Sequence, residues 1–167
     1  MIRECFIKFS FSINIFLLFS FTNPVGASLQ LQSDKTHSTS TSNFENEIFV
    51  YINLHRKSVG LKPLELSNIE SSAAAQHSHN MASGKIPFGH AGFQKRIKMI
   101  AGQEGNITAS AENIAYGIMS AKEVVNVWLQ SPEHKKNIEG DFTFTGIGVA
   151  KGKKGTIYYT EIFTRQE

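Results

Sequence analysis

Three residues in the middle of the chain have side chains that could act together in a polar site. Glu112 stands in the segment Ala111–Gly117, where small and apolar residues surround it. A buried carboxylate needs hydrogen-bonding or charged partners. Two histidines, His90 and His134, stand 22 residues away on either side of Glu112. We therefore predict a cleft lined by His90, Glu112 and His134, provided that the fold brings the three segments together.

Zinc is one candidate occupant of such a cleft. Two neutral imidazoles and one carboxylate are a frequent zinc ligand set that leaves one coordination position for water. The spacing contains no local metal-binding signature, so a metal site with His90 and His134 would depend entirely on the fold. The alternative is a hydrogen-bonded His–Glu–His cluster that attaches loops to a sheet and satisfies Glu112 equally well. Both interpretations are open at this point.

Glu112 is also a candidate catalytic residue, as a general base with one of the histidines as the acid. The chain offers no evident nucleophile. Its single cysteine, Cys5, lies near the N-terminus, and no serine has a G-x-S-x-G context. A hydrolase built on this site would have to activate water, so the sequence leaves open whether the protein is an enzyme.

The N-terminus has the organisation of a secretory signal peptide. Two cations, Arg3 and Lys8, precede an apolar run at 9–21 and the small residues Val25–Ala27. The run has 13 residues, which is short of the roughly 20 that a membrane-spanning helix needs. We expect a signal peptide over residues 1–27, no transmembrane anchor after its cleavage, and a secreted or periplasmic location.

The rest of the chain has the size of one domain. Removal of residues 1–27 would leave 140 residues, which is enough for a hydrophobic core. This part contains no cysteine, so the fold must hold without disulfides. Its net charge is +2, from 15 basic and 13 acidic residues, without the clustered basic face that nucleic-acid binding requires. We predict a flexible Ser/Thr-rich tether at 28–43 and a single domain at 44–167.

Hydrophobic spacing and capping residues predict that helices come first in this domain. Helices at 43–60 and 67–84 would each end at a glycine, and three alanines in the second indicate close packing against another element. Shorter helices are expected at 93–100, after the capping box Ser120–Glu123, and from Pro132 onward. The helix after the capping box should place its tryptophan in the core, because of its helical spacing.

Strands are expected mainly at the C-terminal end. Ala111–Gly117 reads as a short extended segment after a polar loop at 101–108. The β-rich runs at 145–150 and 156–163 are joined by a Gly/Lys turn and predict a hairpin. Helices followed by strands, without βαβ alternation, indicate an α+β fold with helices packed on a small antiparallel sheet.

Six segments carry motifs that are specific only in combination. They are Ala75–Ala82 (AQHSHNMA), Phe88–His90 (FGH), Glu112–Gly117 (ENIAYG), Val125–Ile138, Phe144–Ala150 and Tyr159–Phe163. In this order they resemble the motifs of bacterial, SCP-like CAP domains, from the superfamily of cysteine-rich secretory proteins, antigen 5 and plant pathogenesis-related 1 proteins. The resemblance covers roughly residues 44–165.

The resemblance implies an α-β-α sandwich with a shallow central cleft lined by two histidines and one or two acids. By position, His90 and His134 match the cleft histidines and Glu112 matches the acid, while Asn137 is expected beside the cleft. Ser131 stands where eukaryotic members carry a second glutamate, which weakens any mechanism that needs two carboxylates. The other departures from the family pattern are Asn80 for aspartate, Glu133 for glycine and Glu161 for glutamine.

Members of this superfamily are linked with sterols, fatty acids and protein partners. The resemblance therefore implies a secreted CAP-domain protein whose His/Glu-lined cleft binds a small ligand, a lipid or a metal such as zinc. The expected partners are a small molecule, a lipid or an extracellular protein, and an apolar loop and helix at 88–100 could serve a lipid or close a core. The alternative is a metal-dependent, peptidase-like hydrolase that uses Glu112 with His90 and His134.

Overall fold

The structure is a computed structural model that describes residues 33–167, with side chains from Asn43 onward. The predicted signal peptide at 1–27 and the first part of the predicted tether, 28–32, lie outside the described residues. Within the described part, no helix is long and apolar enough to cross a membrane. The elements in chain order are α1 (Ser33–Ser58), β1 (Glu65–Leu66), α2 (Asn68–Ala82), α3 (Phe93–Glu104), β2 (Ile107–Gly117), α4 (Ala121–Gln130), α5 (Pro132–Ile138), β3 (Phe144–Lys151), a 3-10 turn (Lys153–Gly155) and β4 (Ile157–Gln166).

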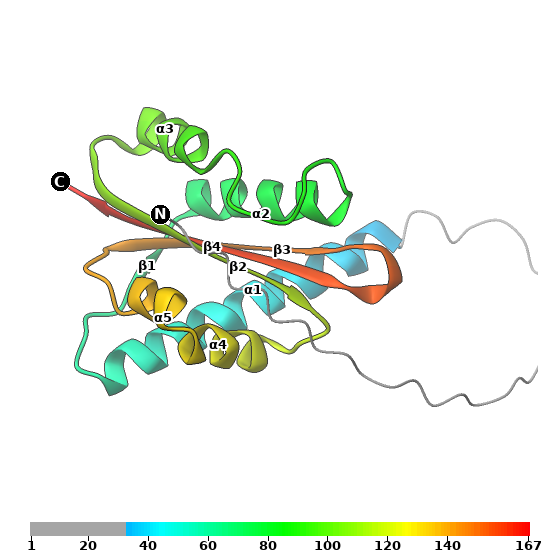
Figure 1. Cartoon of the computed structure of the whole chain (residues 1–167), viewed down its shortest axis with the longest axis horizontal. Helices are drawn as coiled ribbons and strands as arrows, with labels where there is room; N and C mark the ends of the chain where they lie inside the picture. The colour runs from blue at the N-terminus through cyan, green and yellow to red at the C-terminus, as the bar shows by residue number, and fades with distance from the viewer. Residues whose placement is uncertain (1–32) are drawn as a thin grey trace, which may run out of the picture.

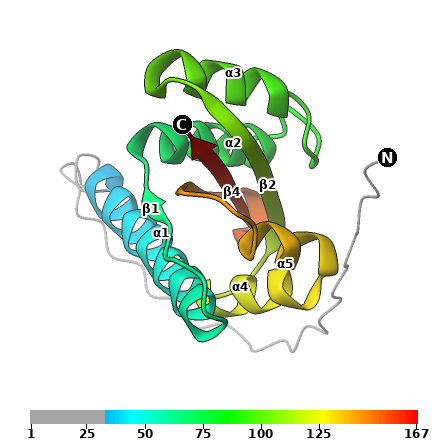
Figure 2. The same cartoon turned by 90° about the vertical axis from the view of Figure 1, so that its left-hand side faces the viewer.

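Helices cover both faces of the sheet, so the domain is an α-β-α sandwich (Figure 1). Figure 2 shows α2 and α3 on one face and α1, α4 and α5 on the other. The strand order is β1-β3-β4-β2, which makes the long strand β2 one edge of the sheet. β4 runs antiparallel to both of its neighbours, and only the two-residue β1 is parallel to β3. The predicted α+β class and sandwich architecture are confirmed.

Helix α1 begins earlier than its sequence predicts. We expected a start at Asn43, but the helix begins at Ser33, so the later part of the predicted tether is helical. Nucleation is the costly step in helix formation, and a helix held by Ile48 and Ile52 in the core can extend outward at little cost. The predicted end is confirmed, because Gly60 follows the helix with a φ of 79°, in the left-handed region that favours glycine.

The polar loop predicted at 101–108 is also shorter than expected. Helix α3 continues to Glu104 and β2 already begins at Ile107, so little connection remains between them. The early start of β2 is explained by pairing, because Ile107 is in register with Gln166 of β4. Local polarity did not indicate a strand here, whereas the neighbouring strand supplies partners for the backbone groups.

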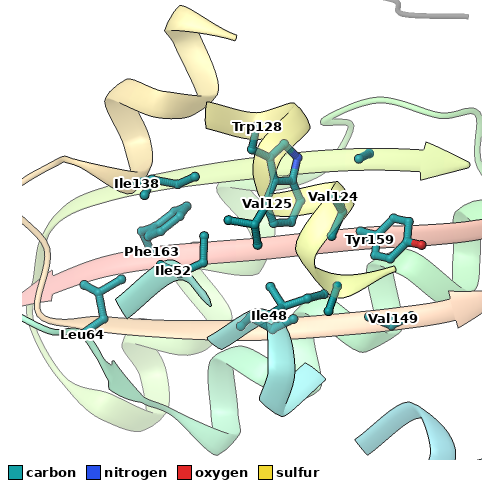
Figure 3. Packing of buried hydrophobic residues seen from close by; sticks show 13 residues of the cluster. Ile48, Ile52, Leu64, Val124, Val125, Trp128, Ile138, Val149, Tyr159 and Phe163 are labelled. Carbon is teal, nitrogen blue, oxygen red and sulfur yellow. The ribbon is translucent and has the colours of Figure 1, made fainter. Parts of the chain in front are cut away.

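The main hydrophobic core lies between the sheet and helices α1 and α4 (Figure 3). Trp128 of α4 is completely buried, and its indole N–H donates a hydrogen bond to the carbonyl of Ile114 on β2 at 3.3 Å. Ile48 and Ile52 from α1 and Phe163 from β4 belong to the same cluster. The prediction that Trp128 is a core residue is confirmed. The burial of each such side chain contributes about 2 kcal/mol to the free energy of unfolding. This cluster therefore holds α1 and α4 against the sheet.

On the opposite face, α2 packs against β3 at very close range. Gly146 and Gly148 leave the space that the helix backbone occupies. A Cβ at Gly148 would stand 1.9 Å from the backbone nitrogen of Ala75, and one at Gly146 would stand 2.2 Å from the backbone of Glu70. The close packing predicted from the three alanines is confirmed. It depends equally on the two glycines of β3.

Two glutamates, Glu70 and Glu161, are completely buried inside the sandwich. Burial raises the pKa of Glu161 to about 8 and that of Glu70 to about 7. Thr145 and Thr164 each donate a hydroxyl hydrogen bond to one oxygen of these carboxyl groups. The other oxygen of each has no hydrogen-bond partner in the described part of the chain. The fold therefore favours the protonated form of both acids.

The glycine at 148 provides a direct test of the α2–β3 contact. We expect Gly148→Ala to destabilise the domain by about 2 kcal/mol or more, because the new methyl group would overlap the α2 backbone. The matched control is Gly102→Ala on α3, where a Cβ meets nothing within 4 Å and should stabilise the helix by about 0.5–1 kcal/mol. Urea denaturation measures both, and equal stabilities would contradict the close contact.

The buried acids predict that stability falls as the pH rises. Below pH 4.5 the carboxyl group of Glu161 is protonated whether the chain is folded or unfolded, and between 4.5 and about 8 only the folded chain keeps the proton. The free energy of unfolding should therefore decrease by up to about 1.4 kcal/mol per pH unit for each such group. Burial lowers the pKa of His77 and of His134, which adds a separate loss of stability below about pH 6.5.

Glu161→Gln should remove one of the two buried carboxyl groups that make the free energy of unfolding decrease with rising pH. The variant should be more stable than the wild type at pH 8 and should show a shallower pH slope, with the slope from Glu70 remaining. Thermal unfolding measured from pH 4.5 to pH 9 tests this. Identical slopes for wild type and variant would show that Glu161 does not hold a proton in the fold.

Candidate functional site

Glu112 of β2 is the centre of a buried polar cluster between β2, α2 and α3. Its side chain is only 2% exposed. Arg96 of α3 donates hydrogen bonds to both carboxylate oxygens through Nε and Nη2, over 2.7–2.9 Å. His90 places its Nδ1 2.9 Å from Oε1 of Glu112. A guanidinium and an imidazole therefore compensate the loss of water around this carboxylate.

Sequence reasoning missed Arg96, although it is the strongest partner of Glu112. The same guanidinium also donates from Nη1 to the carbonyl of Ala91 at 2.9 Å, so it ties the loop after α2 to the sheet. A signal was present, because Arg96 is the only arginine between Arg56 and Arg165. A buried carboxylate is stable only with a compensating positive charge, and Arg96 is the arginine nearest to Glu112 in the sequence.

His77 of α2 is also part of the cluster. It is 2% exposed, and its Nε2 lies 3.0 Å from the carbonyl of Gly89 and 3.9 Å from Oε1 of Glu112. Burial lowers the pKa of His77, so the neutral ring donates its N–H to Gly89. His77 thus holds the residue that precedes His90. His77 is therefore a buried structural histidine with a satisfied hydrogen bond.

An aromatic group extends the site along β2. Phe88 meets Tyr116 edge to face, with ring centroids 4.7 Å apart, and Tyr116 stacks on Tyr158 of β4 at 5.9 Å. All three residues are partly exposed. Tyr116 is two residues from Ile114 and four from Glu112, so the three side chains share one face of the strand. The aromatic surface therefore lies on the same side of the sheet as the polar cluster.

His134 and Asn137 come from α5, on the other face of the sheet. The side chain of Asn113 donates a hydrogen bond to the backbone carbonyl of His134 at 3.1 Å. Asn137 donates to the side-chain oxygen of Asn113 at 2.8 Å. Asn113 follows Glu112 on β2, so its side chain points to the opposite face. Asn113 is the second residue that sequence reasoning missed, and it positions α5 against the edge strand.

The imidazole of His134 has no hydrogen bond to Glu112 or His90 in the described structure. Its Nδ1 is buried without a hydrogen-bond partner there. Burial, together with the nearby imidazole of His90, lowers the pKa of His134, so the ring is neutral near pH 7. The structure thus joins His90 directly to Glu112 and brings His134 into the same neighbourhood as a separate, unpaired imidazole.

The donor set does not fit the predicted zinc site. Among the side chains that the structure describes, residues 43–167, no group of three or more His, Cys, Asp or Glu is arranged to hold a metal ion. Arg96 occupies both oxygens of Glu112, so a zinc ion bound to this carboxylate would lie against a guanidinium. A zinc ion and a guanidinium are both positively charged, so they repel each other strongly when they contact the same buried carboxylate. The hydrogen-bonded cluster is the interpretation that these contacts favour.

A separate groove of about 560 Å³ runs along α5 and the loop that follows it. It includes Asn137 but none of His90, Glu112 and His134, so this groove is distinct from the Glu112 cluster. Its lining residues are Pro132, Lys135, Lys136, Asn137, Glu139, Gly140 and Phe142.

Comparison with known proteins identifies a family. Residues 49–163 match the family model described as CAP, the cysteine-rich secretory protein family. The chain is 32% identical over 133 residues to the uncharacterized protein YkwD of Bacillus subtilis, covering 75% of this chain and 51% of that protein. It is 29% identical over 125 residues to the uncharacterized membrane protein YlbC of the same organism, covering 73% and 34%. The chain thus spans about half or less of these relatives.

Solved structures share the fold. An extracellular protein of Bacillus anthracis that contains an SCP domain superposes with a TM-score of 0.68 at 22% identity, over 85% of this chain and 45% of that one. An outer surface protein of Borrelia burgdorferi gives 0.61 at 20% identity, over 86% and 100%. A cysteine-rich secretory protein of Staphylococcus aureus gives 0.63 at 19% identity, over 75% and 39%.

The Arg96–Glu112 pair should be essential to the stability of this site. Arg96→Ala would leave a buried carboxylate without its cation and should cost about 3 kcal/mol. Adding Glu112→Gln should restore much of that loss, because a neutral amide needs no cation. Arg165→Ala is the control, since its ion pair with Asp141 is exposed and should matter little. Denaturant unfolding measures all three, and similar losses for both arginines would contradict the assignment.

Proposed function

The chain belongs to the CAP, or cysteine-rich secretory protein, family, and from that premise we propose that it is an extracytoplasmic binding protein. The observation that carries this proposal is the saturation of Glu112. Arg96 contacts both of its oxygens and His90 contacts one of them. These contacts occupy the carboxylate oxygens that a water molecule or a substrate proton would have to approach in general-base catalysis. The role of Glu112 is to orient His90.

His90 is the residue that Glu112 prepares for a ligand. With Nδ1 directed at the carboxylate, the opposite nitrogen, Nε2, is left to accept a hydrogen bond. The His90 side chain is 29% exposed, so part of the imidazole is in contact with solvent. His134 adds a second neutral imidazole, whose Nδ1 is buried, so Nε2 is the nitrogen proposed to meet a ligand. The two imidazoles suit a group that both donates and accepts, such as an amide or a hydroxyl.

The aromatic surface completes the proposed ligand class. Phe88 and Tyr116 lie on the same face of the sheet as Glu112 and are partly exposed. An apolar surface beside a few polar groups is typical of small-molecule sites. We therefore infer a small, uncharged ligand with an apolar part and an amide or hydroxyl head. A lipid with such a head group falls within this class.

The location outside the cytoplasm is supported by the relatives and by the sequence. One similar structure is described as an extracellular protein and another as an outer surface protein. The N-terminal 27 residues have the order of a signal peptide. The metal-dependent hydrolase is the weaker candidate, because it would need Glu112 free to hold a metal or to activate water.

Native mass spectrometry tests the binding role. Protein purified from cells that produce it should carry a non-covalent small-molecule adduct. His90→Ala and His134→Ala should reduce the adduct at least tenfold, because each removes a hydrogen-bonding partner from a partly buried site. His79→Ala on the exposed side of α2 is the matched control and should keep the adduct. A wild-type protein without adduct, or an adduct that survives in both site variants, would overturn the proposal.

The hydrolase candidate calls for a different pair of measurements. Zinc titration by calorimetry and a panel of peptidase and esterase substrates are applied to wild type and Glu112→Gln. We expect no zinc affinity and no hydrolysis that depend on Glu112, because Arg96 already occupies its oxygens. A tenfold loss of either property in Glu112→Gln would favour the hydrolase over the binding protein.

A further inference from the structure

One end of the domain gathers lysines from two separate segments, and we call it the basic tip. Three of its lysines, Lys151, Lys153 and Lys154, lie in and beside the turn between β3 and β4. The fourth, Lys85, follows α2. The turn touches the end of that helix, because a Cβ at Gly152 would stand 3.1 Å from the carbonyl oxygen of Ala82. Figure 1 shows the β3–β4 turn and the end of α2 on the same side of the molecule.

An exposed apolar side chain accompanies these lysines. Ile118 is 80% exposed, more than any other large hydrophobic residue in the described part of the chain. It follows Gly117, the last residue of β2, which is in register with Ile157. Ile157 is also in register with Lys151 on the other side of β4. Gly117 on β2, Ile157 on β4 and Lys151 on β3 are therefore neighbours across the sheet, and Ile118 lies at the same end of the domain as the basic tip.

The positive charge of the basic tip is not neutralised within the described part of the domain. Its four lysines are exposed, and none of them lies within an ion pair there. Two acids on neighbouring elements make hydrogen bonds within the domain and form no ion pair with these lysines. Glu123 accepts hydrogen bonds from Ser120 in the capping box of α4, and Glu45 accepts the backbone N–H of Val149. An approaching surface would thus meet lysine side chains around an isoleucine.

We propose that the basic tip docks this protein onto an anionic lipid surface, with Ile118 entering the head-group region. Lysines that project from a turn attract anionic lipids over about one Debye length. An exposed aliphatic side chain gains by leaving water for the acyl boundary. The half-buried Tyr116 and Tyr158 lie behind it, and aromatic rings favour the membrane interface.

Vesicle co-sedimentation of the full chain tests the proposal. Binding should be stronger to phosphatidylglycerol-containing vesicles than to pure phosphatidylcholine vesicles and should weaken with added salt. Each lysine near an anionic surface strengthens binding about fivefold, so Lys153→Gln with Lys154→Gln should weaken it about 25-fold. The matched control changes Lys135 and Lys136 of α5 to glutamine, which leaves the basic tip intact. Equal affinities for the two double variants would overturn the proposal.

A second measurement reports on the tip itself, whatever else holds the chain to a vesicle. The only cysteine is Cys5, so a Cys5→Ser background allows one environment-sensitive dye to be placed at Ile118→Cys. Its emission should shift to the blue on anionic vesicles. The same dye at Met99→Cys, an exposed position on α3, should not shift. No shift at position 118, or equal shifts at both positions, would refute docking through this end.

A soluble polyanion distinguishes the lipid surface from an anionic polymer. Heparin serves as the probe, in the same buffer and with the same lysine variants. Tip-dependent binding to heparin without a dye shift on vesicles would assign the basic tip to a polymer and overturn the lipid proposal. Tip-dependent vesicle binding with the dye shift at 118 would support it.

Discussion

The ion pair between the buried Glu112 and Arg96 organises the side of the domain where α2 and α3 cover the sheet. Glu112 has been removed from water, and a charge in that position is stable only with close partners. Arg96 supplies the cation and also holds the carbonyl of Ala91, while His77 holds the carbonyl of Gly89. The loop after α2 is therefore fastened at two points. His90 lies between them, so its orientation follows from the same electrostatic requirement.

Two successive residues of an edge strand organise the two faces of the sandwich. Glu112 faces α2 and α3, and Asn113 faces α5, because side chains alternate along a strand. Asn113 is hydrogen-bonded to the backbone of His134 and to Asn137. The two histidines reach this edge from opposite sides through these neighbours. The site is therefore best understood as an assembly at the edge of the sheet, in which the acid positions its partners and leaves the ligand contacts to the imidazoles.

The position of the polar site at the edge of the sheet depends on close packing between α2 and β3 and around Trp128. Gly146 and Gly148 allow α2 to lie directly on β3, and that position brings His77 within 3.9 Å of Glu112. A larger residue in β3 would lift the helix and with it the support of the loop. The core around Trp128 fixes the other layer, since its indole is hydrogen-bonded to β2 itself. The polar site thus depends on packing in both layers of helices.

The sequence by itself determined the features that depend on neighbouring residues. The glycine after α1, the capping box at Ser120 and the core position of Trp128 are readable because a few adjacent residues decide each of them. The family motifs also indicated that His90 and Glu112 belong together. Only the tertiary structure decided that Arg96 is the partner of Glu112, 16 residues away, and that Nδ1 of His134 is buried without a partner among the described residues. It also decided the length of β2. These features depend on which distant segments meet, and that is set by the packing of the whole sandwich rather than by any local pattern.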